Sequence, residues 1–203
     1  PLVDPSRAVP SAAGLDSTAQ SVTSAPIPPA GFVEWVGTSG LVNLAIVFTD
    51  VIGSTSLNVE LGDEVWGRIR DAHFEHAGNL VRVRGGCVIK TIGDAVMAAF
   101  RNAVDALAFA MQLEADPGHP AVHIRAGVHV GQVQVSQGDT FGTQVNLAAR
   151  VAGKAKQGGV WISDRVREDW LTQSPNQSPT WSKHNETLRG FHGRRFTLWS
   201  LPP

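Results

Sequence analysis

Two aspartates occupy places in the sequence where strands are expected to end. Asp50 directly follows an apolar run at residues 41–48, and Asp94 lies in a two-residue turn between the short apolar runs 87–92 and 95–100. If the strands are neighbours, both carboxylates reach one spot, where they could hold one or two hard divalent cations and leave positions for phosphate oxygens. The plainer alternative, which these two residues alone favour, is that Asp50 caps a helix and Asp94 makes the turn.

The segment VIGST at residues 51–55 connects the first strand to an expected helix. Free backbone N–H groups at the start of a helix can hold a phosphate chain. This signal is weak by itself. A phosphate cradle beside two metal-binding carboxylates is, however, what a nucleoside triphosphate requires.

Three more polar side chains stand in otherwise apolar segments. Lys90 interrupts the expected strand VIKTI, and Asn146 and Arg150 are four residues apart in NLAAR, so they share one face of a helix. Taken separately, these residues are most simply explained by a solvated strand face and a surface helix.

The apolar periodicity predicts an α+β domain that positions these residues, with helices packed on a sheet. Helical spacing begins near Asp63, Asn102 and Thr143 and ends near Gly85, Pro117 and Ala155, and a short helix is expected at 164–171. The expected inward positions of the first two helices are Val65, Ile69, Ala72, His76 and Leu80, then Val104, Leu107, Ala108 and Met111. Strands are expected at 41–48, 87–92, 95–100, 121–135, 160–163, 180–188 and 195–201.

Composition limits the function classes. The 203 residues include 17 Lys and Arg against 18 Asp and Glu, a net charge of -1 that lacks the basic signature of generic nucleic-acid binding or of an acidic membrane surface. No run approaches the roughly 18 apolar residues of a membrane helix. A single cysteine, Cys87, excludes an intramolecular disulfide and suits a reducing compartment such as the cytoplasm.

The first part of the chain differs from the rest. Residues 1–34 are rich in Pro, Ser and Ala and have no apolar period, so we expect a flexible linker there and one folded domain at 35–203. The chain begins with Pro, and we therefore expect it to be a piece of a longer protein whose other regions could carry a sensor or an anchor.

Four segments together resemble one family. FTDVIGST, GGCVIKTIGDAVMAAF, RAGVHVGQV and DTFGTQVNLAARV stand in the order and at the spacing found in class III nucleotidyl cyclases, the catalytic domains of adenylate and guanylate cyclases. The resemblance covers residues 41–201. It implies a ferredoxin-like, palm-type antiparallel sheet with helices packed on it.

The resemblance also implies a role for each polar residue. Asp50, Asp94 and the backbone carbonyl of Val51 would hold two divalent cations, Mg²⁺ or Mn²⁺, and Gly53, Ser54 and Thr55 would hold the triphosphate. The reaction would be in-line attack of the ribose 3′-hydroxyl on the α-phosphorus with release of pyrophosphate. Asn146 would orient the ribose, and Arg150 would stabilise charge on the α-phosphate.

Lys90 and Asp139 match the two positions of the family that read the base. Adenine offers an acceptor at N1 and a donor at N6, which a Lys donor and an Asp acceptor satisfy, whereas guanine presents the opposite pattern. The pair therefore predicts ATP as substrate and cyclic AMP as product.

Two departures from the family pattern concern the triphosphate. Gln132 stands where some members have a phosphate-binding arginine, and the basic residue expected from the C-terminal hairpin is either Arg189 or Arg194, of which Arg189 is preferred. We expect these departures to affect rate and ATP affinity.

The resemblance further implies a head-to-tail homodimer with two equivalent sites at its interface. One chain would supply Asp50 and Asp94, and the other Lys90, Asp139, Asn146 and Arg150. Two alternatives remain: a cyclase that also takes GTP, and a catalytically silent domain that serves dimerisation or nucleotide sensing. A polymerase-like palm would share the paired aspartates but needs a basic nucleic-acid track, which this composition lacks.

Overall fold

A computed structural model describes residues 31–174 and 179–201, and most of the expected linker, residues 1–30, lies outside them. In chain order, the structure contains α1 (Gly31–Val36), β1 (Gly40–Val51), α2 (Ser54–Leu61), α3 (Asp63–Val83), β2 (Cys87–Ile92), β3 (Ala95–Phe100), α4 (Ala103–Ala115), β4 (Ile124–Ser136), β5 (Asp139–Phe141), α5 (Thr143–Ala152), β6 (Gly159–Ser163), α6 (Asp164–Gln173), β7 (Ser182–Thr187) and β8 (Arg195–Leu201). None of the described helices is both long and apolar enough to cross a bilayer.

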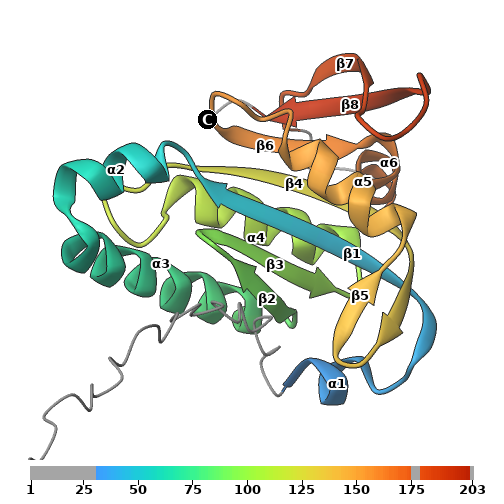
Figure 1. Ribbon diagram of the computed structural model, residues 1–203. Helices are drawn as coiled ribbons and strands as arrows, with labels where there is room; N and C mark the ends of the chain where they lie inside the picture. Colours follow the sequence, from blue (N-terminus) through green and yellow to red (C-terminus); the bar gives the residue numbers. More distant parts are fainter. Residues whose placement is uncertain (1–30, 175–178, 202–203) are drawn as a thin grey trace, which may run out of the picture.

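One sheet organises the domain, in the strand order β2-β3-β1-β4-β6-β8-β7, with β5 paired to β4 (Figure 1). The expected α+β fold is confirmed. All pairs are antiparallel except β4–β6, which are parallel. The predicted β2–β3 hairpin is present, and β3 pairs with β1, so the strands that precede Asp50 and follow Asp94 are neighbours.

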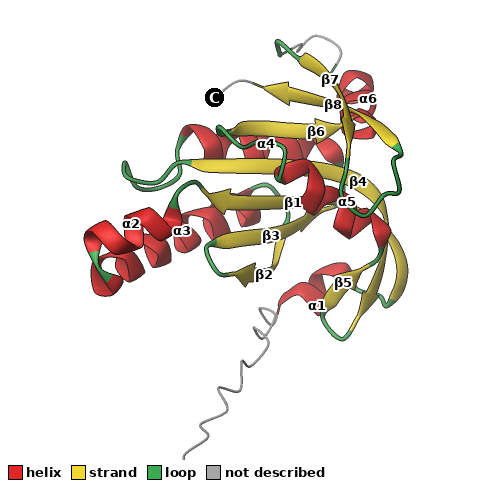
Figure 2. Cartoon of the chain, turned by 45° about the horizontal axis from the view of Figure 1, so that its top comes forward, coloured by secondary structure: helices red, strands yellow, loops and turns green. Residues whose placement is uncertain are grey.

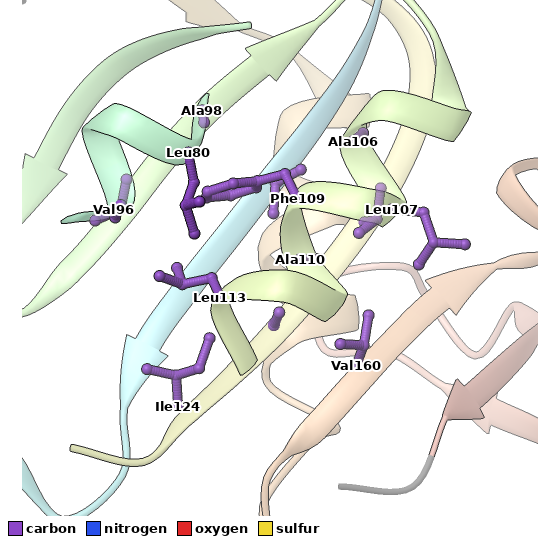
Figure 3. Packing of buried hydrophobic residues seen from close by; sticks show 14 of the residues in the cluster. Leu80, Val96, Ala98, Ala106, Leu107, Phe109, Ala110, Leu113, Ile124 and Val160 are labelled. Atoms are coloured by element: carbon purple, nitrogen blue, oxygen red, sulfur yellow. The ribbon is translucent and has the colours of Figure 1, made fainter. Parts of the chain in front are cut away.

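Both faces of the sheet are covered by helices, and its central strand β1 carries apolar side chains on both faces. Ala45 and Val47 of β1 pack in a core with α3, α4 and α6, whereas Leu44 and Ile46 pack on the opposite face with α1 and α5. Figure 1 shows α4 behind the sheet and α5 in front of it. Figure 3 shows the first core, in which side chains of α4 lie against strands β3, β4 and β6.

The inward face of α3 differs from the expected one. The buried side chains are Trp66, Ile69, His73, Ala77, Leu80 and Val81. Ile69 and Leu80 were predicted correctly, but Val65 and Ala72 are exposed and His76 is half-buried. The observed face is turned by about one residue from the expected one, and it includes the large ring of Trp66. Gly62, rather than Asp63, is the N-cap.

The inward face of α4 is likewise wider than expected. Leu107 is buried as predicted, and Val104, Ala108 and Met111 are half-buried. The most buried side chains also include Phe109, Ala110 and Leu113. Asn102 caps this helix as predicted, and its side chain accepts a hydrogen bond from the backbone N–H of Asp105 at 2.8 Å.

Helix α1 crosses the expected boundary between linker and domain at residue 35. Phe32 is fully buried in the second core. The Trp35 indole N–H donates to the carbonyl of Gly85 at 2.9 Å, and the Arg101 guanidinium lies 4.7 Å from its ring. Helix α1 therefore packs on the domain through Phe32, Trp35 and Val36.

Close packing of α5 on β4 depends on two glycines. A Cβ at Gly127 would come within 2.1 Å of the backbone nitrogen of Ala152, and one at Gly131 within 2.8 Å of the Gln144 side chain. Glycine at both places lets the helix lie directly on the strand. Because this face of α5 packs on β4, Asn146 and Arg150 lie on the exposed face of the helix.

A buried histidine under α5 gives a pH prediction. Burial lowers the pKa of His129, against the opposing effect of its hydrogen bond with Gln144. Nδ1 and Nε2 lie 2.7 Å from Ser163 Oγ and Gln144 Oε1, which a neutral ring satisfies. Because the unfolded chain binds protons more readily than the folded one, the free energy of unfolding should fall as the pH falls through about 6.5. Chemical denaturation at pH 5.5–8 measures this.

The variant His129→Gln should have a shallower pH dependence, and His123→Gln, at an exposed position, should keep the wild-type slope. Burial also lowers the pKa of His73, so part of the slope should remain in His129→Gln. An identical slope in His129→Gln and wild type would contradict the assignment.

Candidate active site

The two aspartates lie at the same end of the sheet. Asp50 is the second-last residue of β1. Its neighbour Thr49 pairs with Val96 of β3, and Asp94 lies in the turn two residues before Val96. Figure 2 shows the arrowhead of β1 and the β2–β3 turn on the side of α2, away from β5 and α1. The condition on which the metal-site prediction depended is therefore met.

The oxygens of these carboxylates suit a cation. Oδ2 of Asp94 is buried and has no hydrogen-bond partner. Oδ2 of Asp50 accepts from Arg125, with Nε at 2.9 Å and with Nη2, and no described residue donates to its Oδ1. A buried carboxylate oxygen without a donor is unfavourable unless a cation or a solvent molecule satisfies it. Among residues 31–174 and 179–201, no group of three or more His, Cys, Asp or Glu is placed to hold a metal.

The segment after β1 forms the start of α2. Gly53 is the N-cap, with a φ of 68°, and no side chain caps the helix. This left-handed backbone favours glycine. The backbone N–H groups of Ser54 and Thr55 belong to the first turn of α2 and donate no hydrogen bond to a capping side chain. These two residues follow Asp50 by four and five positions in the sequence. Val51, whose carbonyl is the predicted third metal ligand, ends β1.

Lys90 and Asp139 are brought together although 49 residues separate them. They form an ion pair whose side chains are 23% and 21% exposed. The Asp139 Oδ1 also accepts from the backbone N–H of Thr140 at 2.7 Å. A register shift in β2 between Val88 and Lys90 places Lys90 opposite Met97, on the face of the second core. The predicted base-reading residues thus form one donor–acceptor pair.

Asn146 and Arg150 lie on the exposed side of α5. The buried side of this helix consists of Val145, Leu147, Ala148, Val151 and Ala152. Within the described chain, neither polar side chain has a hydrogen-bond or ion-pair partner that competes with a ligand. The exposed face of α5 therefore offers an amide and a guanidinium for binding a ligand.

The two candidate C-terminal arginines differ in their surroundings. Arg194 lines a pocket of about 350 Å³ with Gln144 and His129, and its guanidinium lies 5.0 Å from the ring of Phe196. Both arginines, including Arg189, which was preferred, are exposed and lie in the segment between β7 and β8. Gln132 is exposed on β4.

Sequence reasoning missed Arg125, the partner of Asp50. The two residues face each other in the β1–β4 register but are 75 residues apart in the chain. Their pairing follows from strand register, and the sequence near Arg125 carries no signal for it.

Comparison with known proteins places the chain in a family. A model of the family described as "Adenylate and Guanylate cyclase catalytic domain" matches residues 38–199. An "Adenylate cyclase" of Streptomyces coelicolor is 34% identical over 130 residues, which are 63% of this chain and 34% of that protein. The chain thus spans about a third of the length of this relative, and of another "Adenylate cyclase" from Streptomyces griseus it covers 29%.

Solved structures agree on the fold. The adenylyl cyclase CyaB from P. aeruginosa superposes with a TM-score of 0.67 at 19% identity, over 82% of this chain and 96% of that one. The guanylyl cyclase Cya2 gives the same TM-score at 18% identity, over 80% and 93%. At this identity the likeness concerns the fold alone, and it includes proteins named for both nucleotides. With the family match over residues 38–199, these findings identify the chain as a member of the adenylate and guanylate cyclase catalytic domain family.

Proposed function

We propose that this domain is an adenylate cyclase that converts ATP into 3′,5′-cyclic AMP and pyrophosphate. The observation that carries the choice of ATP is the Lys90–Asp139 ion pair. Its ammonium can donate to adenine N1 and its carboxylate can accept from N6. Guanine would place a donor against the ammonium and an acceptor against the carboxylate, and such mismatched buried groups are strongly disfavoured.

The remaining residues act on the ribose and the phosphates. Asn146 donates to the ribose and fixes the 3′-hydroxyl for in-line attack. Arg150 stabilises the charge that develops at the α-phosphate, and the N–H groups of residues 53–55 bind the triphosphate. The basic residue from the C-terminal hairpin, Arg189 or Arg194, adds a further positive charge, and the pocket beside Arg194 favours that residue.

Asp50, Asp94 and the carbonyl of Val51 are the residues that would hold two divalent cations, Mg²⁺ or Mn²⁺. The Oδ2 of Asp94 supports this assignment, since it is a buried carboxylate oxygen without a hydrogen-bond partner among the described residues, and Mg²⁺ prefers oxygen ligands. When bound, such cations lower the pKa of the attacking hydroxyl and offset the charge of the leaving pyrophosphate.

We further propose a head-to-tail homodimer. Asn146 and Arg150 support it, because they are exposed and have no partner among the described residues, so they can contact a substrate held by a second chain. Asp50 and Asp94 of one protomer would then face Lys90, Asp139, Asn146 and Arg150 of its partner. We propose a cytoplasmic location for the domain, which suits an ATP-consuming reaction and the single Cys87.

The direct test is product identification. The purified chain is incubated with ATP or GTP and with Mg²⁺ or Mn²⁺, and the products are separated by chromatography. Cyclic AMP formed from ATP, with much less cyclic GMP from GTP, supports the proposal. Equal use of both nucleotides would favour the relaxed cyclase, and nucleotide binding without any cyclic product would favour the silent domain.

The base-reading pair gives a specificity prediction. Lys90→Glu combined with Asp139→Cys inverts the donor and acceptor pattern, so the ratio of kcat/KM for ATP over GTP should fall by about 100-fold. Steady-state kinetics with both nucleotides measure this ratio.

The matched control is Lys154→Gln with Glu186→Gln, which removes an ion pair of similar exposure between the turn after α5 and strand β7. It should leave the ratio unchanged. A double variant of Lys90 and Asp139 that remains active with an unaltered ratio would disprove the assignment of these residues to the base.

A further inference from the structure

Arg125 of β4 makes an ion pair with Asp50 across the β1–β4 register. Both its Nε, at 2.9 Å, and its Nη2 donate to the same carboxylate oxygen, Oδ2. The two side chains are 33% and 28% exposed, so the pair is partly shielded from water. Two N–H groups from one planar guanidinium fix the position of this oxygen more closely than a single flexible ammonium does, and they leave Oδ1 free.

Among the described residues, Oδ1 of Asp50 has no donor, and neither has the buried Oδ2 of Asp94. The guanidinium occupies Oδ2 of Asp50 and not Oδ1, and the Oδ2 of Asp94 on the neighbouring turn is buried and unpartnered. The cluster of Asp50, Asp94 and Arg125 carries a net charge of -1 rather than -2. With this lower net charge, the affinity of the cluster for a cation depends more on the positions of its carboxylate oxygens.

We propose that Arg125 is a positioning residue that orients Asp50 and reserves its Oδ1 for the cation; this inference rests on the proposed function. The hydrogen-bonded partner of a metal ligand restricts the ligand's motion, so the cation does not have to order it on binding. Arg125 also compensates the Asp50 charge while the site holds no cation, which allows both carboxylates to remain partly buried.

Two roles of Arg125 predict opposite changes in cation affinity when its side chain is removed. If Arg125 only competed for the carboxylate, its removal would raise the net charge of the cluster to -2 and strengthen cation binding. If it positions the carboxylate, removal weakens cation binding despite the more negative charge.

The test uses Mn²⁺ as the probe, together with 3′-deoxy-ATP, which lacks the attacking hydroxyl and cannot cyclise. Water-proton relaxation enhancement reports protein-bound Mn²⁺. Arg125→Gln should bind Mn²⁺ about 10- to 100-fold more weakly than wild type, the usual loss for an outer partner of a metal ligand. Arg125→Lys should fall between the two, and the control Lys154→Gln should match wild type.

A second comparison separates positioning from a general structural role. In an Asp50→Asn background, adding Arg125→Gln should cause no further loss of Mn²⁺ binding, because Arg125 acts through the Asp50 carboxylate. A further loss of the same size in that background would overturn the inference. So would Mn²⁺ binding by Arg125→Gln that equals or exceeds that of wild type.

Thermal unfolding accompanies each titration. If Arg125→Gln does not fold, Arg125→Lys carries the test: weaker Mn²⁺ binding at an unchanged unfolding midpoint supports positioning, and unchanged binding overturns it. Failure of the proposed function has a different result, because the wild-type protein would then bind no Mn²⁺ beyond that held by the free nucleotide.

Discussion

Asp94→Asn should abolish metal-dependent cyclase activity while the domain remains folded. Asparagine suits the same turn but contributes no negative charge to a cation, so kcat/KM should fall by about 100-fold or more, at least the loss expected for an outer partner of a ligand. The wild-type Oδ2 is buried without a partner, and removing its charge lowers the cost of that burial. The thermal unfolding midpoint without metal should therefore be equal to or above that of wild type.

Asp50→Asn should lose activity to the same extent for the same reason. It retains an oxygen that can accept from Arg125 but loses the ion pair, so we expect a small stability loss of about 1 kcal/mol or less for this partly exposed pair. Assays of turnover with Mg²⁺ and Mn²⁺, alongside calorimetry, measure both effects.

The control for these variants is Asp71→Asn on an exposed part of α3, which should keep full activity. Substantial turnover in either Asp50→Asn or Asp94→Asn would contradict the metal assignment and leave Asp50 with its ion pair to Arg125 and Asp94 with its place in the turn. If instead neither variant folds, these aspartates have a structural role that the metal assignment does not include.

Mixing two inactive variants should restore about a quarter of the wild-type activity. Asp50→Asn and Asn146→Ala should each be nearly inactive, since each lesion affects both sites of a homodimer. In a mixed dimer both lesions fall into one site and the other site is intact. With equal amounts and random exchange, about half of the dimers are mixed and each has one working site of two, which gives about a quarter.

The measurement is cyclic AMP formation after the two variants are mixed, with subunit exchange followed independently by a fluorescent label on each. Specific activity should also fall on dilution if the dimer is weak, as mass action requires. The matched control mixes Asp50→Asn with Asp94→Asn, which lie on the same side of the proposed site and should not complement each other. Exchange without recovery in the first mixture would mean that each chain builds its own site.

Local pattern was sufficient for much of the fold. The β2–β3 hairpin depends on a two-residue turn between apolar runs, and the cap at Asn102 depends on a contact three residues away, so neighbouring residues decide both. The same reason explains why the strand that ends at Asp50 and the turn at Asp94 were recognised. The roles assigned to both residues came from the resemblance to the cyclase family and stay predictions.

Helix orientation was less predictable. The apolar positions of α3 permit two inward faces that differ by about one residue, and burial of Trp66 and His73 selects one of them. Helix α1 has too few residues for a periodic signal, and Phe32 is buried only because the second core offers space for it. Which residues of α1 and α3 are buried depends on the elements that each helix packs against, and the spacing of apolar residues within a helix does not specify those elements.

The sequence by itself determined the family, the strand ends that carry Asp50 and Asp94, and the helix face shared by Asn146 and Arg150. Only the tertiary structure brought Lys90 to Asp139, across 49 residues, and Arg125 to Asp50, across 75. Both pairs depend on register: a shift in β2 turns Lys90 to its face, and the β1–β4 pairing sets Arg125 opposite Asp50. The physical reason is that a strand's own sequence specifies which side chains share a face, whereas the partner across the sheet is chosen by the burial of the whole core.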